Sequence, residues 1–125
     1  MIQRLAVLFF ILVAIHSLAV GLMLMFMPEE WFCWFGFSLH ERFFASQGGA
    51  FHIILVPVYY LAAMAFKGGT GMHWVKYVVF VKCFAAIFLC GYVLVNGFNL
   101  MVLASGAGDG LMGLLALLFL KKAPG

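Results

Sequence analysis

Charged side chains are scarce in this chain of 125 residues, because Asp, Glu, Lys and Arg together make up only 9% of it. Soluble domains carry about 25% charged and roughly 45–50% apolar residues, whereas 67% of the residues here are hydrophobic. This composition indicates a single-domain integral membrane protein. The basic residues form no stripe of the kind that phosphate recognition requires, so nucleic-acid binding is not expected.

Cysteine is also rare, and its spacing excludes two kinds of site. The three cysteines contain no C-x-x-C pair, which argues against a thiol–disulfide relay and against a zinc centre. Cys33 falls in a connecting segment, while Cys83 and Cys90 share one helical face and are expected to be buried thiols. The chain also lacks a nucleophile elbow, a P-loop, a dinucleotide fingerprint and H-E-x-x-H, so no catalytic residue is predicted.

Long apolar runs dominate the remaining sequence. Four of them reach the roughly 20 residues that a membrane-spanning helix needs, and they cover about residues 4–27, 43–66, 74–95 and 99–120. Pro28, the glycines after Lys67 and Asn96-Gly97 separate the runs. The first run is longer than a signal-peptide core, so we expect it to be retained. The sequence therefore predicts an all-α, antiparallel four-helix bundle in a membrane.

The few charges are distributed unevenly between the two ends of this predicted bundle. One end carries most of the cations, namely Arg4, Lys67, Lys76, Lys121 and Lys122. The other end carries Arg42 beside the acids Glu29, Glu30 and Glu41. The positive-inside rule then predicts a multi-pass protein of the bacterial cytoplasmic (inner) membrane with both termini in the cytoplasm.

The connection of residues 28–42 is rich in aromatic side chains, namely Trp31, Phe32, Trp34, Phe35 and Phe37. Amphipathic rings are enriched at the level of the lipid headgroups. We therefore expect this segment to lie in the outer membrane interface, either as a simple connection or as a lid over an outward-facing cavity.

Two charges interrupt the apolar runs, Lys82 in the third and Asp109 in the fourth. An ionised group at bilayer depth costs at least ~2.5–3.5 kcal/mol on insertion scales, so it normally faces the protein interior with a partner. At ~1.5 Å per residue, Lys82 lies about 12 Å from one side and Asp109 about 15 Å from the other, which is a similar depth. Gly106 and Gly113 place Asp109 on a packing face. The two residues are predicted to pair, as a structural clasp or as a proton or substrate site.

The second run adds polar side chains that could accompany this pair, namely Gln47, His52, Tyr59 and Tyr60. Gly48 and Gly49 precede His52 by about one turn, which places His52 on a tight-packing face. Pro57 is expected to kink the helix. Together with Lys82 and Asp109, these residues are the candidate lining of a site for a quinone, a lipid or a proton-coupled substrate.

His16 and His52 are predicted to lie at the same depth, so a b-type haem between them has to be considered. Only Arg42 is well placed for the haem propionates, and few glycines flank His52. No cofactor is therefore the leading expectation, with haem b or quinone as alternatives. His40 and His73 fall at the interfaces, where we expect them to be solvated.

The ordered landmarks resemble a broad group of small bacterial four-helix membrane proteins loosely called DoxX-like. The landmarks are Pro28-Glu29, Gly36, Phe43-Phe44, Gly48 or Gly49, Tyr60-Leu61-Ala62-Ala63, Lys82 and Asp109-Gly110-Leu111. The resemblance covers nearly the whole chain and implies an antiparallel four-helix fold with Lys82 and Asp109 in its core. It implies no settled activity, and the histidines at positions 16, 40 and 52 are not part of its pattern.

Three functions follow as hypotheses. The first is a non-catalytic inner-membrane subunit or accessory factor that acts through helix packing, with a homo-oligomer or a membrane-protein partner. The second is a small-molecule site in the bundle core. The third is a haem-b electron carrier that uses His16 and His52.

Overall fold

The computed structural model describes residues 1–39 and 41–123, and every regular element in this part of the chain is a helix. The elements are α1 (Ile2–Phe26), α2 (Glu29–Trp34), α3 (Phe43–Gly68), α4 (His73–Asn96) and α5 (Leu100–Lys121). Each of the four long helices is long and apolar enough to cross a membrane. Their ends agree with the predicted spans to within about two residues, which is the usual uncertainty of a helix boundary.

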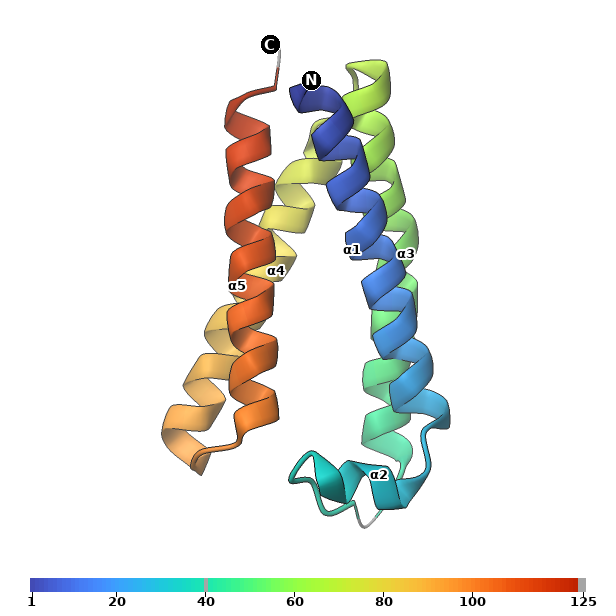
Figure 1. The fold of residues 1–125 in the computed structure, drawn as a ribbon, viewed down its shortest axis with the longest axis vertical. Coiled ribbons are helices and arrows are strands. Elements are labelled where there is room, and N and C mark those ends of the chain that lie inside the picture. Colours follow the sequence, from blue (N-terminus) through green and yellow to red (C-terminus); the bar gives the residue numbers. More distant parts are fainter. Residues whose placement is uncertain (40, 124–125) are drawn as a thin grey trace.

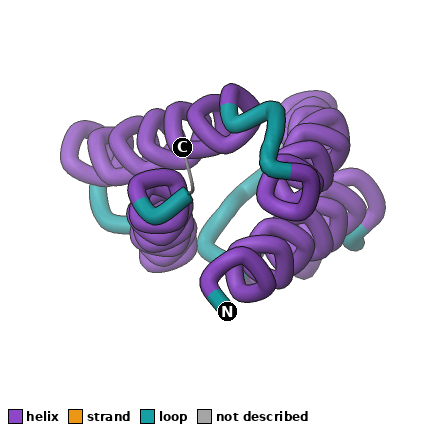
Figure 2. The backbone as a smooth tube through the Cα atoms, turned by 90° about the horizontal axis from the view of Figure 1, so that it is seen from above, coloured by secondary structure: helices purple, strands orange, loops and turns teal. Residues whose placement is uncertain are grey.

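The long helices are arranged as two pairs (Figures 1 and 2). Helix α1 packs along α3, and α4 packs along α5. The pairs meet mainly through α3 and α4, with a small contact between α1 and α5. Both termini lie at one end of the molecule and α2 lies at the other, and the two pairs diverge toward α2 (Figure 1).

Glycines bring the backbones of α1 and α3 into direct contact. A Cβ atom added at Gly49 would lie 2.5 Å from the carbonyl oxygen of Gly21, and one added at Gly21 would lie 2.8 Å from that of Gly49. Neither position can hold a larger side chain unless the helices move apart. This contact confirms the prediction that His52 projects from a tight-packing face, since its own Cβ would be 3.2 Å from a Cβ at Gly21.

Glycines also allow close packing in the seam between α4 and α5, where they face cysteine side chains. A Cβ at Gly106 would lie 3.0 Å from the sulfur of Cys90, and one at Gly113 would lie 3.1 Å from that of Cys83. Cys83 and Cys90 are both half-buried. The two thiols therefore serve as small apolar packing groups, although they are less completely buried than the sequence predicts.

The core lies where the two pairs meet, toward the end that holds both termini. Phe10 and Phe66 are buried and stack with their ring centroids 5.7 Å apart. Phe119 of α5 reaches both helices of the other pair, with its ring 5.4 Å from that of Phe9 and 6.3 Å from that of Phe66. Alanines at positions 6, 62, 63, 65 and 116 fill the remaining space.

At the other end, the aromatic connection contains a short helix that was not predicted from the sequence. Helix α2 lies across this end of the molecule (Figure 1). The Trp31 and Trp34 rings stack 5.5 Å apart, and Phe32 is buried. The guanidinium of Arg42 donates to the carbonyl oxygen of Met25 at 2.9 Å, which satisfies an orphan acceptor at the end of α1.

Three further predictions concern His40 and His73 at the interfaces and a kink at Pro57 within α3. His40 lies outside the described residues. His73 begins α4 and is exposed, as expected. Helix α3 continues through Pro57, whose side chain is exposed.

Candidate functional site: a buried ion pair and its polar neighbours

The predicted pairing of Lys82 with Asp109 is confirmed by the structure. Lys82 Nζ on α4 donates to Asp109 Oδ1 on α5 across 2.6 Å. The side chain of Lys82 is only 3% exposed, whereas that of Asp109 is 13% exposed. The ammonium group is thus enclosed, and the carboxylate is the member of the pair that keeps some contact with the surroundings.

The small residues of α5 make this short distance possible. A Cβ added at Gly113 would lie 3.3 Å from the Cβ of Lys82, and one at Gly110 would lie 3.5 Å from that of Ala86. Close approach of the two backbones allows the long lysine side chain to turn toward Asp109 within the seam. One short segment of α5 therefore supplies both the acid and the space around it, with the sequence Gly106-x-x-Asp109-Gly110-x-x-Gly113.

Tyr59 of α3 connects the ion pair to the other helix pair. Tyr59 is only 1% exposed, and Lys82 Nζ lies 5.3 Å from the centroid of its ring. A cation at this distance is attracted to the negative face of an aromatic ring, most strongly where water is excluded. The structure thus confirms Tyr59 as a neighbour of the pair.

His52 makes its polar contacts with Ser17 across the seam between α1 and α3. The Ser17 hydroxyl donates to the backbone oxygen of His52 at 2.9 Å, and Ser17 Oγ also lies 3.2 Å from His52 Nδ1. A hydroxyl has one proton, so the second contact requires the ring to donate from Nδ1. In the neutral imidazole, Nε2 is then the acceptor.

Ser17 and Tyr59 are both buried, so these polar contacts of α1 and α3 are made inside the bundle. Ser17, which is fully buried, was missed by the sequence reasoning. Its signal was its position one turn before Gly21, on the same face of α1.

Three of the predicted site residues are not buried beside the ion pair. Gln47, Tyr60 and His16 are all exposed, with Tyr60 at 51%. Because α1 and α3 touch at Gly21 and Gly49, a porphyrin cannot fit between these helices beside His52. The arrangement therefore does not favour a haem held by His16 and His52.

The cluster can hold a proton or a polar group, but it is not built as a metal centre. Within residues 1–39 and 41–123, no three His, Cys, Asp or Glu side chains are grouped so as to hold an ion. Lys82 has three N–H donors, of which one serves Asp109. The chemistry that the site offers is charge compensation and hydrogen bonding.

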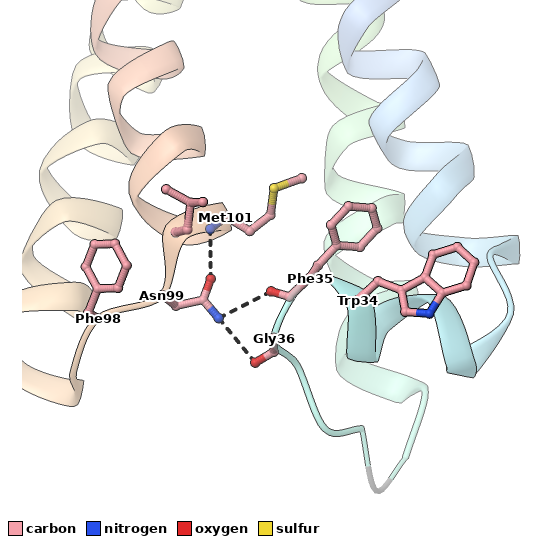
Figure 3. Close-up of a pocket in the computed structure, with 7 residues that line it drawn as sticks. Trp34, Phe35, Gly36, Phe98, Asn99 and Met101 are labelled. Atoms are coloured by element: carbon pink, nitrogen blue, oxygen red, sulfur yellow. Dashed lines mark hydrogen bonds between the residues drawn. The ribbon is translucent and has the colours of Figure 1, made fainter.

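A second polar feature, which the sequence reasoning did not identify, lies beside α2 (Figure 3). A hollow of about 390 Å³ is lined by aromatic side chains, Met101 and Asn99. The Asn99 side chain accepts from the backbone N–H groups of Met101 and Val102, at 3.0 and 3.1 Å, and so caps α5. Its amide group also donates to the backbone oxygens of Phe35 and Gly36.

In the part of the chain that the structure describes, the protein is all-helical, with four helices long enough to span a membrane and an ion pair between two of them. Comparison with known proteins finds no matching family model, no matching curated protein and no matching solved structure. The resemblance to DoxX-like proteins therefore stays a prediction.

Proposed function

We propose that the chain is a multi-pass protein of the bacterial cytoplasmic membrane whose four long helices cross the bilayer in antiparallel order, with both termini in the cytoplasm. The length and apolar character of the helices support membrane insertion. Lys67 and Lys121 lie in the last turns of α3 and α5, at the end that holds both termini (Figure 1). Glu29 and Glu30 begin α2 at the opposite end. This asymmetry supports the orientation.

Within that membrane the protein acts as a non-catalytic subunit or accessory factor, held together by the Lys82–Asp109 pair. The observation that carries this proposal is a second small-residue face on α5. Gly106, Gly110 and Gly113 are occupied by α4, whereas Ala104 and Ala107 are exposed and a Cβ at Gly108 would meet nothing within 4 Å. Small residues allow close packing of membrane helices, so this face suits a second copy or a partner helix.

The test compares substitutions at two glycines where an added side chain would meet no neighbouring atoms of the protein. Gly108→Leu places a bulky side chain on the second face of α5, and Gly91→Leu does the same on α4, where a Cβ also meets nothing within 4 Å. We expect purification in mild detergent to yield a homo-oligomer or a complex that Gly108→Leu disrupts and Gly91→Leu leaves intact. A monomer without partners, or equal effects of both changes, would contradict the proposal.

A small-molecule site around the ion pair is the second candidate function. The observation that favours it is the partial exposure of Asp109, together with the buried Tyr59 ring beside Lys82. A quinone, a lipid headgroup or a proton-coupled substrate would find both a donor and an acceptor there. Mass spectrometry of lipid and quinone extracts tests this candidate. Lack of enrichment, with no growth defect in Asp109→Asn, would reject it.

A further inference from the structure

The two helix pairs are joined very differently at their two ends. Near the termini they are joined by packed rings, with Phe119 against Phe9 and Phe66. Midway along, Lys82 lies over the ring of Tyr59. Toward α2 the pairs diverge (Figure 1).

At this end the hydrogen bonds between the two pairs are made by one side chain. Asn99 Nδ2 donates to the backbone oxygen of Gly36 at 3.2 Å and to that of Phe35 at 3.4 Å (Figure 3). In the described part of the chain, no other hydrogen bond crosses from the α1–α3 side to the α4–α5 side.

Side chains fill the space around Asn99 incompletely. Hollows of about 390 and 330 Å³ lie against the junction, and Gly36, Phe98 and Asn99 line both of them. Gly36 has a φ of +78°, a left-handed conformation that favours glycine. A Cβ at Gly36 would also come within 3.0 Å of Asn99 Nδ2.

We propose that Asn99 is a latch that holds the two helix pairs together at the α2 end, so that breaking its two hydrogen bonds lets the pairs separate about the aromatic contact near the termini. Net hydrogen-bond contributions are modest, so loss of each bond raises the open population by roughly two- to tenfold. A contact of this strength can open and close readily. The latch is a property of the fold and stands independently of the proposed partner.

Two substitutions separate the latch from the helix cap. Asn99→Ser and Asn99→Asp both retain an oxygen that can cap α5, but neither retains the amide that donates to Phe35 and Gly36. Asp adds a negative charge facing two carbonyl oxygens, so it opens the junction further than Ser does. The matched control is Asn96→Asp, because Asn96 donates only within its own helix, to the oxygen of Tyr92.

The opening is measured by pulsed electron paramagnetic resonance with spin labels in nanodiscs. One label is placed on the native Cys33 of α2 and the other on Leu94→Cys of α4, and both sites are exposed. Cys83 and Cys90 are replaced by alanine so that they carry no label. A reference pair on Leu8→Cys and Leu118→Cys, in a chain that also carries Cys33→Ala, reports on the end that holds the termini.

We expect the distance between the Cys33 and Leu94→Cys labels to lengthen from wild type to Asn99→Ser to Asn99→Asp, with the reference distance unchanged. Asn96→Asp should give the wild-type distribution. The latch would be overturned if both Asn99 variants gave the wild-type distance, or if the reference distance lengthened equally. Unchanged helical content by circular dichroism shows that the variants are folded. If Asn99→Asp does not fold, the distance measured in Asn99→Ser decides whether Asn99 is a latch.

Discussion

Lys82 and Asp109 lie on neighbouring helices with their charged atoms 2.6 Å apart, and Lys82 is the more deeply enclosed of the two. Removing one member leaves the other as an uncompensated charge in an apolar interior. Removing both members leaves only apolar surfaces in the seam. The pair therefore specifies how α4 and α5 are aligned more than it adds net stability.

We expect Lys82→Leu or Asp109→Leu alone to destabilise the protein by about 3–5 kcal/mol, whereas the double variant should lose much less than the sum of the two. The measurement is a double-mutant cycle on the free energy of unfolding. Lys76→Leu is the control, because Lys76 is exposed and its loss should change stability by no more than about 0.5 kcal/mol. Additive losses would show that the two charges do not stabilise each other.

The adjacent glycines of α3 provide the second prediction. Gly49→Ala places a methyl group 2.5 Å from the Gly21 oxygen, so we expect it to separate α1 from α3 and to cost about 1–3 kcal/mol. Gly48→Ala meets only the end of the Leu24 side chain at 3.7 Å, and should be neutral or stabilising by up to about 1 kcal/mol. Thermal unfolding of both variants checks this difference. Equal stability of the two variants would contradict the close backbone contact.

The spans could be predicted from the sequence because each is a long apolar run ended by Pro, Gly or a cation. The ion pair could be predicted because two charges in such runs need a partner, and counting residues placed Lys82 and Asp109 at a similar depth. Neither inference required knowledge of the tertiary arrangement.

The division into two diverging helix pairs could not be predicted in this way. In a membrane helix, lipid-facing and buried faces are both apolar, so hydropathy does not show which helix contacts which. The contacts depend on where glycines such as Gly21 and Gly49 allow backbones to touch. Helix α2 and the two contacts of Asn99 were missed because a six-residue helix has little periodicity and asparagine near a turn usually serves as a cap.

The contact between Ser17 and His52 predicts the tautomer of the histidine. Because the Ser17 proton is used by the backbone oxygen of His52, the neutral ring should carry its proton on Nδ1. Nitrogen-15 NMR shifts of His52 in labelled protein distinguish the two tautomers. Ser17→Ala should remove the preference and destabilise the protein by about 1 kcal/mol. A wild-type ring protonated on Nε2 would show that the hydroxyl donates to the imidazole instead.

The proposed orientation predicts which ends of the helices react with a thiol reagent that cannot cross the membrane. Cys33 is exposed on α2, which the positive-inside rule places on the outer side. We therefore expect a charged maleimide to label Cys33 in intact spheroplasts. Thr70→Cys, in the turn between α3 and α4 and in a Cys33→Ala background, should react only after the membrane is permeabilised, because Lys67 and Lys76 flank this turn. Labelling of Thr70→Cys in intact cells, with Cys33 protected, would show that the protein is inserted in the opposite orientation.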